Sequence, residues 1–137
     1  MRLRAVPTKR EIVSLADMVK LDIVEAEVLT GTNDPLLASA MLEEWGARET
    51  VITRSEGALV RHQGQTWFER YVNKSAAGRT GRGDTTMGAY LSWRMEHDVL
   101  ESLRFAVALA SIKMETPGPF SGTLGDVLAL MSHMASS

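Results

Sequence analysis

The sequence has no cysteine among its 137 residues, so it has no disulfide, no thiol nucleophile and no thiolate metal ligand. This absence is typical of proteins in a reducing compartment. The formal net charge is -2 at pH 7, which gives no polycationic character of the kind that indicates a nucleic-acid partner. No apolar run approaches the roughly 18 residues of a membrane span, and no signal-peptide core follows Met1. We therefore expect one cytoplasmic domain, with neither nucleic acid nor membrane as its partner.

Other absences exclude particular catalytic arrangements. The three histidines, His62, His97 and His133, are scattered without the spacing of a transition-metal site. No Gly-x-Ser-x-Gly elbow indicates covalent catalysis by a serine. The glycine-rich segment near the middle of the chain is not followed by Gly-Lys-Ser/Thr, so a P-loop lysine on phosphate is not expected.

Periodic apolar positions predict helices that alternate with short strands. Strands are expected at 19–23, 50–53, 58–62 and 66–70, with a hairpin turn at 63–65, and helices at 8–19, 25–29, 35–45, 85–96, 100–114 and 123–134. This order predicts a layered α/β fold with a mainly parallel sheet. Fewer strands are visible than such a sheet normally has, so we expect part of a larger domain.

The most informative segment runs from Gly78 to Asp84 and leads into the helix predicted at 85–96. Its three glycines allow several backbone N–H groups to point to one place, and the helix N-terminus adds partial positive charge. This pattern indicates an anion site. Asp84 lies beside it, where a carboxylate can take a proton from a hydroxyl that attacks a phosphoryl group. The alternative is that Asp84 only caps the helix, and these residues leave both interpretations open.

Four motifs, which follow one another in the family's order and at about its spacing, resemble those of the PfkB/ribokinase family of carbohydrate kinases. The glycine-rich loop is similar to the second family motif, and the other three resemble the Asn-x-x-Glu segment, the strand and turn before the nucleotide pocket, and the helix and loop that flank the adenine. They lie at 78–84, 22–31, 50–58, and 105–108 with 117–119.

The resemblance extends from about Leu15 to Met134 and implies the C-terminal, nucleotide-binding and catalytic half of such a kinase, at residues 1–137. It implies a partial ribokinase-like three-layer α/β fold, with parallel strands, a hairpin and flanking helices. The implied reaction is ATP-dependent phosphoryl transfer to a hydroxyl of a sugar, polyol or nucleoside, and the sequence does not name the acceptor. Two alternatives remain: a nucleotide-binding module without an acceptor site, or an interaction remnant that forms a homodimer or associates through an exposed sheet edge.

The resemblance also implies roles for individual residues. Asp84 is implied as the general base, and the backbone amides of Gly81, Arg82 and Gly83 as the anion hole. For the Arg82 side chain two interpretations stay open: it contacts phosphate, or it lies in solvent.

For the metal, the resemblance implies Glu25, with Asp22 at the family's asparagine position, as support for Mg²⁺ through water. Taken without the loop, these two residues favour a simpler role as caps of a short helix. Contacts with ATP or ADP are implied for six residues: Thr53, Gly57, Thr80, Thr116, Pro117 and Gly118.

Overall fold

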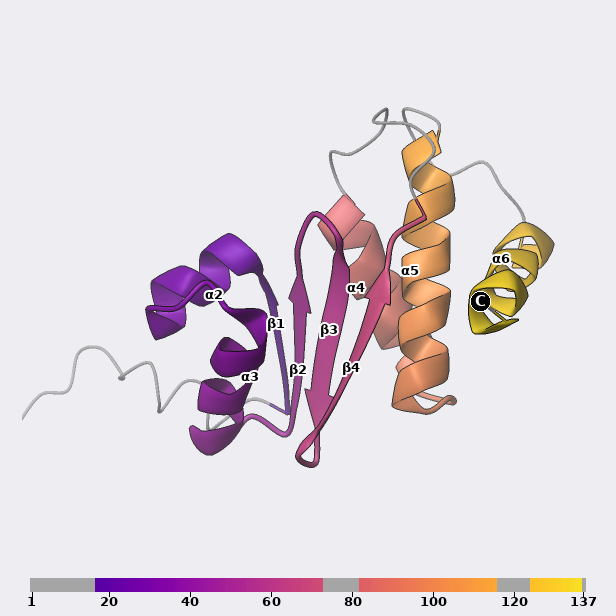
Figure 1. Cartoon of the computed structure of the whole chain (residues 1–137). Helices are drawn as coiled ribbons and strands as arrows, with labels where there is room; N and C mark the ends of the chain where they lie inside the picture. The colour runs from indigo at the N-terminus through magenta and orange to yellow at the C-terminus, as the bar shows by residue number, and fades with distance from the viewer. Residues whose placement is uncertain (1–16, 73–81, 116–123, 137) are drawn as a thin grey trace, which may run out of the picture. The chain divides into compact units, whose positions relative to one another are not determined.

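Residues 17–72, 82–115 and 124–136 are described by the computed structural model of the chain (Figure 1). The elements in chain order are β1 (Met18–Asp22), α2 (Ile23–Thr30), α3 (Pro35–Glu44), β2 (Glu49–Thr53), β3 (Gly57–His62), β4 (Gln65–Arg70), α4 (Arg82–Arg94), α5 (Val99–Glu115) and α6 (Leu124–Ser136). The strands form one four-stranded sheet in the order β1-β2-β3-β4. A sheet accompanied by helices confirms the predicted α/β class.

The sheet is mixed, and the prediction of a mainly parallel sheet was wrong. β1 and β2 are joined through α2 and α3, a connection of the length that a parallel pair requires. Only residues 54–56 separate β2 from β3, where the Arg54 N–H donates to the Gly57 carbonyl at 2.9 Å, so these two strands form a hairpin. β2, β3 and β4 therefore alternate in direction (Figure 1).

The second hairpin turn follows the sequence prediction closely. Gln63 and Gly64 connect β3 to β4, and both have positive φ, at 51° and 77°. A two-residue loop with positive φ at both positions matches the right-handed twist of paired strands. The glycine adopts this conformation without a Cβ penalty.

At its N-terminal end, the described chain differs from the prediction. The helix expected at 8–19 lies outside the described residues up to residue 16, and Met18 and Val19 begin β1 instead. Val19 and Leu21 are half-buried while Lys20 and Asp22 are exposed, which is the alternation of a strand with one packed face. The β-branched and alternating residues here outweigh the helical stripe that precedes them.

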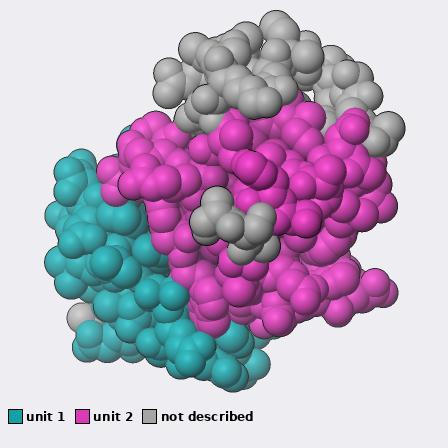
Figure 2. Space-filling model, turned by 45° about the vertical axis from the view of Figure 1, so that its right-hand side comes forward, with its two compact units in different colours: residues 1–52, 59–66 teal, residues 53–58, 67–137 magenta. Residues whose placement is uncertain are grey.

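The chain divides into two compact units, residues 1–52 with 59–66 and residues 53–58 with 67–137 (Figure 2).

In the first unit, α3 begins as predicted. Asp34 is its N-cap and accepts from the Leu36 N–H at 3.0 Å, and Pro35 is its first residue. Gly31 closes α2 in a left-handed conformation, with φ of 86°.

Two small apolar clusters form the core of the first unit. In one, Leu42 and Ala47 are buried against half-buried residues of β1 and α2 and against Trp45, which follows α3. In the other, Ala26 and Ala38 are fully buried together with Ile52 of β2. The small alanine side chains allow the two helices to approach this strand closely.

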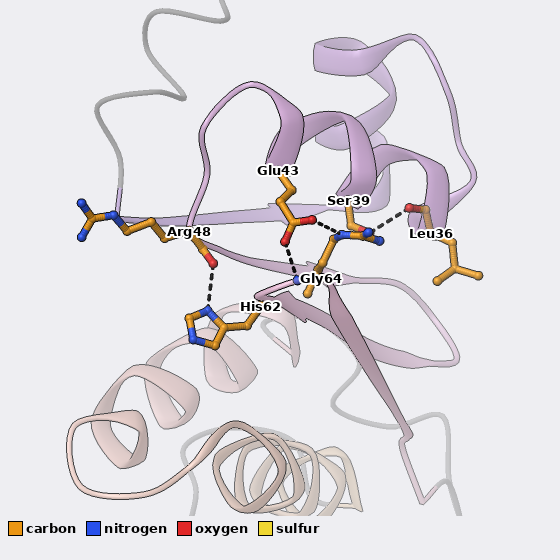
Figure 3. A network of polar contacts seen from close by, with 7 residues as sticks. Leu36, Ser39, Glu43, Arg48, His62 and Gly64 are labelled. Carbon is orange, nitrogen blue, oxygen red and sulfur yellow. Dashed lines mark hydrogen bonds and ion pairs between the residues drawn. The ribbon is translucent and has the colours of Figure 1, made fainter.

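Glu43 fastens α3 to the hairpin of β3 and β4 (Figure 3). Its Oε1 accepts from Arg61 Nε at 3.0 Å, and its Oε2 accepts from the Gly64 N–H at 2.9 Å. The Gly64 N–H, assisted by the Arg61 guanidinium, lowers the pKa of Glu43 below its ordinary value. Beside this pair, His62 Nδ1 lies 2.8 Å from the Arg48 carbonyl oxygen.

In the second unit, α4 and α5 pack closely along each other. Tyr90 of α4 and Leu103 and Val107 of α5 are fully buried. Trp93 stacks on Phe105 with ring centroids 3.9 Å apart. As the sequence predicted, α5 is apolar and buried on most of its circumference between residues 102 and 111. In the described part of the chain, no helix is long and apolar enough to cross a membrane.

Candidate functional site

Asp84 lies in the first turn of α4, at the third helical position, because the helix begins at Arg82. Its side chain is exposed to solvent. An N-cap residue precedes the first helical residue, so the interpretation of Asp84 as merely a cap does not hold in this structure.

The start of α4 offers hydrogen-bond donors to an anion. The first backbone N–H groups of a helix have no partner within it, and the helix dipole adds partial positive charge at the same end. Arg82 and Gly83, two members of the predicted anion hole, are the first two residues of α4. The third member, Gly81, lies outside the described residues, as does Thr80, a predicted contact with ATP or ADP. A phosphate at this helix start would meet backbone donors next to a carboxylate.

Thr86 attaches the beginning of α4 to the end of β4. Its Oγ1 lies 2.8 Å from the hydroxyl oxygen of Tyr71, the residue that follows β4. Thr86 is fully buried and Tyr71 is 6% exposed. Sequence reasoning missed this pair, because the two residues are distant along the chain and no pattern in the sequence links them.

The next residue is held by a different helix. The Val72 N–H donates to Ser111 Oγ of α5 at 2.8 Å, and this hydroxyl donates in turn to the Val107 carbonyl at 2.7 Å. The end of β4 is thus bonded to α4 through Tyr71 and to α5 through Val72. A serine in an apolar helix was the only sequence signal for this contact.

Asp22 and Glu25 form a reciprocal capping box at the start of α2. Asp22 Oδ1 accepts from the Glu25 N–H at 2.7 Å, and Glu25 Oε1 accepts from the Asp22 N–H at 2.9 Å. The capping role that these residues suggested on their own is therefore confirmed. The metal role implied by the resemblance stays a prediction.

The capping box is compatible with a hydrated metal ion. Each carboxylate uses one oxygen for the backbone and keeps a second oxygen, and both side chains are exposed. Mg²⁺ retains much of its water and is commonly bound through one or two carboxylates together with substrate phosphates. Within the described ranges, no cluster of three or more acidic, histidine or cysteine residues offers a more complete protein site.

Thr53 and Gly57 lie on either side of the turn between β2 and β3. Thr53, the last residue of β2, is buried at 4% exposure. A Cβ on Gly57 would lie 2.1 Å from the Glu69 carbonyl oxygen, so only glycine permits this approach to β4. In the turn, Arg54 forms an ion pair with Glu56, and a hydrogen bond from the Ser55 hydroxyl, with help from Arg54, lowers the pKa of Glu56.

The predicted site residues fall into both compact units. Asp22 and Glu25 belong to the first unit, where the capping box brings them together. Thr53, Gly57 and Asp84 belong to the second unit. The other predicted contacts with ATP or ADP lie outside the described residues: Thr116, Pro117 and Gly118.

The second unit also contains a cavity of about 440 Å³ at the end of β4. Its charged lining consists of Glu69, Arg70 and Arg104, and Glu69 accepts from Arg104 Nε at 3.1 Å. The Arg70 guanidinium lies 5.9 Å from the centre of the Phe68 ring, which also lines the cavity. No sequence motif pointed to these residues.

Comparison with known proteins agrees with this architecture. Residues 2–123 match the model of the pfkB family carbohydrate kinases. Ribokinase of Haemophilus influenzae is 26% identical over 132 residues, which are 90% of this chain and 43% of that protein. The chain therefore spans less than half of the curated ribokinase that it matches.

Two solved structures show the same fold. A pyrophosphate-dependent kinase in the ribokinase family, complexed with a pyrophosphate analog and myo-inositol, matches with a TM-score of 0.77 and 33% identity over 88% of this chain and 44% of its own. Arabidopsis thaliana ribokinase, complexed with ribose and ATP, matches with a TM-score of 0.79 and 24% identity over 89% of this chain and 43% of its own. The predicted partial ribokinase-like fold is thus confirmed.

Proposed function

Because the chain belongs to the pfkB family of carbohydrate kinases, we propose that it supplies the nucleotide-binding and catalytic half of a kinase that phosphorylates a hydroxyl of a sugar, polyol or nucleoside. In this proposal residues 1–137 correspond to the C-terminal half of the kinase domain. The observation that carries the proposal is the position of Asp84, an exposed carboxylate in the first turn of α4. A general base at this point lies beside the backbone donors that a transferring phosphoryl group needs.

Asp84 moves the proton in the proposed reaction. The acceptor hydroxyl gives its proton to the Asp84 carboxylate as its oxygen forms a bond to phosphorus. The bond between that phosphorus and the donor's bridging oxygen breaks, and the leaving group keeps the electron pair. The N–H groups of Gly81, Arg82 and Gly83 donate to the oxygens of the transferred group, where charge develops. This step requires positioning and electrostatic stabilisation, without a covalent enzyme intermediate.

Asp22 and Glu25 are the residues that we propose to hold Mg²⁺. Each has one carboxylate oxygen that the capping box leaves for a metal-bound water. When bound, Mg²⁺ would neutralise charge on the donor phosphates. The capping box orients both carboxylates through short hydrogen bonds, which supports a metal role alongside the helix-capping role.

ATP is the phosphoryl donor that we propose first, with Thr53, Gly57, Thr80 and residues 116–118 as its contacts. One observation favours a second donor, inorganic pyrophosphate. The solved pyrophosphate-dependent kinase is 33% identical to this chain, whereas the Arabidopsis ribokinase in complex with ATP is 24% identical. Both donors present phosphate oxygens, and a helix start binds either through the same kind of contact.

Titration calorimetry distinguishes the two donors. The purified chain, first shown to be folded by circular dichroism, is titrated with Mg·ADP and separately with magnesium pyrophosphate. Under the proposal, at least one of the two binds saturably, and binding weakens when Mg²⁺ is removed or when Asp22 and Glu25 are both replaced by alanine. Binding of pyrophosphate without ADP would assign the second donor. A folded chain that binds neither ligand contradicts the proposed donor site.

The acceptor reaction separates a kinase from the two alternatives. Turnover is measured with a sugar, a polyol and a nucleoside, in the wild-type chain and in Asp84→Asn. Turnover that depends on the acceptor and is lost in Asp84→Asn supports the kinase. Donor binding without turnover is the result expected of a nucleotide-binding module. Neither activity, in a chain that elutes larger than a monomer, is expected of an interaction remnant.

A further inference from the structure

We propose that Tyr71 and Thr86 are positioning residues for phosphoryl transfer, because their buried hydrogen bond fixes the first turn of α4 against the end of β4. The inference rests on the proposed function, since the position of this turn affects catalysis only if Asp84 is the base. The two hydroxyl oxygens lie 2.8 Å apart, and either can be the donor. We call this pair the Tyr71–Thr86 clamp.

The clamp lies close to the proposed base without being part of it. Thr86 is two residues after Asp84 and one helical turn after Arg82. Its buried hydroxyl faces the protein, while the Asp84 side chain faces solvent. The bond spans 15 positions of sequence and thus joins the end of β4 directly to the first turns of α4. The orientation of Asp84 and of the Arg82 and Gly83 amides therefore depends on it.

The strand side of the clamp is itself held in place. The Tyr71 N–H donates to the Glu56 carbonyl at 3.0 Å, and the Val72 N–H donates to Ser111 Oγ at 2.8 Å. Ser111 is 1% exposed. The Tyr71 backbone and the adjacent Val72 are consequently held by hydrogen bonds, so the Tyr71 hydroxyl is in a defined position to bond α4. Buried, connected hydrogen bonds of this kind specify one geometry.

Accurate position is what the proposed chemistry needs. A general base and an oxyanion-stabilising donor act only when their atoms lie within hydrogen-bond reach of the reacting atoms. A displacement of about 1 Å can reduce a rate by about a hundredfold. Loss of the clamp should therefore lower kcat more than it raises KM, because it displaces the base relative to a bound substrate.

The test removes each hydroxyl separately and then both together. Tyr71→Phe, Thr86→Val and the double variant are compared with Thr86→Ser, which keeps the hydroxyl, and with Thr66→Val, the same change at an exposed threonine of β4. The first measurement is hydrogen exchange of the amides of residues 86–88, which report opening of the first turn. Each single variant should raise their exchange roughly tenfold. The effect of the double variant should be clearly smaller than the sum of the two single effects, because the bond between the two hydroxyls is lost in all three variants.

The second measurement is kcat, which reports on function. If the chain gives turnover, Tyr71→Phe and Thr86→Val should lower kcat about tenfold or more, whereas Thr86→Ser and Thr66→Val should stay close to wild type. Where the chain alone gives no turnover, kcat is replaced by the Kd for Mg·ADP or magnesium pyrophosphate, whichever binds the wild-type chain, and this Kd should rise in the same two variants.

Additive effects on exchange, or exchange equal to wild type, would overturn the clamp. Faster exchange together with unchanged kcat, or unchanged Kd where that is the readout, would overturn its positioning role. The Asp84→Asn variant tells the two proposals apart. If Asp84→Asn leaves turnover intact, the proposed function fails and the positioning role fails with it. If turnover is lost in Asp84→Asn but is normal in Tyr71→Phe, only the clamp proposal fails.

Discussion

Helices α4 and α6 begin with the same pattern, in which glycine and aspartate occupy the second and third helical positions. In α4 these residues are Gly83 and Asp84, and in α6 they are Gly125 and Asp126. Both aspartates are exposed. The helices differ at the fifth position, because Thr86 is fully buried and bonded to Tyr71, whereas Leu128 of α6 is 42% exposed.

The comparison shows that a favourable helix start is not enough to define a site. The first N–H groups of any helix have no partner within that helix, and the helix dipole adds partial positive charge there, so α4 and α6 have both features alike. What distinguishes α4 is the buried hydrogen bond between Thr86 and Tyr71, which joins its first turns to the end of β4. We expect function to follow the helix start that this bond positions.

The strongest test replaces the two aspartates in parallel. Asp84→Asn should lower acceptor-dependent turnover by about 10²–10⁴-fold, the usual contribution of a general base. Asp126→Asn, at the equivalent position of α6, should change turnover less than about twofold, because no proton transfer is assigned to it. Steady-state kinetics, with circular dichroism to verify folding, provide the measurement. Equal losses in both variants would mean that the aspartates support helix stability and not catalysis.

The second test disturbs the strand to which α4 is attached. Gly57→Ala places a Cβ against the Glu69 carbonyl of β4, 2.1 Å away, and neither backbone can yield easily. We expect it to lower the free energy of unfolding by about 3 kcal/mol, as overpacking does in a tight site. Gly88→Ala, in α4, meets nothing within 4 Å and should stabilise the protein by about 0.5–1 kcal/mol. Urea denaturation measures both, and a tolerated Gly57→Ala would contradict the packing explanation.

A third test extends the comparison to α2, whose acidic residues have a known structural role. Asp22→Ala removes the N-cap acceptor and should cost about 1 kcal/mol in thermal or urea unfolding. Asp22→Asn keeps a side-chain oxygen for the Glu25 N–H, so its stability should stay near wild type. Because asparagine is the family's residue at this position, Asp22→Asn should also leave Mg²⁺-dependent donor binding near wild type. Glu25→Gln keeps an oxygen for the Asp22 N–H but loses the charge, so it should weaken that binding if Glu25 supports Mg²⁺. Normal donor binding in Glu25→Gln would leave capping as the whole role of Glu25.

The smallest expected effect concerns pH and the first compact unit. Because the pKa of Glu43 is lowered on folding, the stability that it contributes is present above its unfolded value, near 4.5. This stability is lost as the pH falls through the lower, folded value. Glu43→Gln should therefore reduce the difference in unfolding free energy between pH 7 and pH 3, by about 0.5–1 kcal/mol. An unchanged pH dependence would show that the contacts of Glu43 with Arg61 and Gly64 contribute nothing.

Local signals in the sequence predicted the local structure well. Asp34 and Pro35 marked the start of α3, Gly31 marked the end of α2, and Gln63 and Gly64 marked a hairpin. Each of these depends on the backbone preferences of a few adjacent residues, which are visible in the sequence. The sheet direction was predicted wrongly, because a three-residue link after β2 was not recognised as a second hairpin.

The site was only partly predictable. The Asp-x-x-Glu pattern at residues 22–25 suits both a capping box, which the structure shows, and the proposed Mg²⁺ site, so the sequence alone does not separate the two roles. Asp84 was predicted just before a helix starting at residue 85, whereas it lies in the first turn of a helix that begins at Arg82. Its attachment through Thr86 and Tyr71 was not predicted. Such a contact arises from tertiary packing between distant segments, for which a single sequence holds no periodic signal.

The two short turns that join β2, β3 and β4 have a consequence for how the protein folds. Contacts between neighbours along the chain form quickly, because little loop entropy is lost, and an isolated hairpin forms in about 1–10 μs. Pairing of β1 with β2 must wait for the intervening helices to close a longer loop. We expect residues 49–70 to gain structure early in refolding and β1 to join later, so the segment that ends beside the clamp is in place before the sheet is complete.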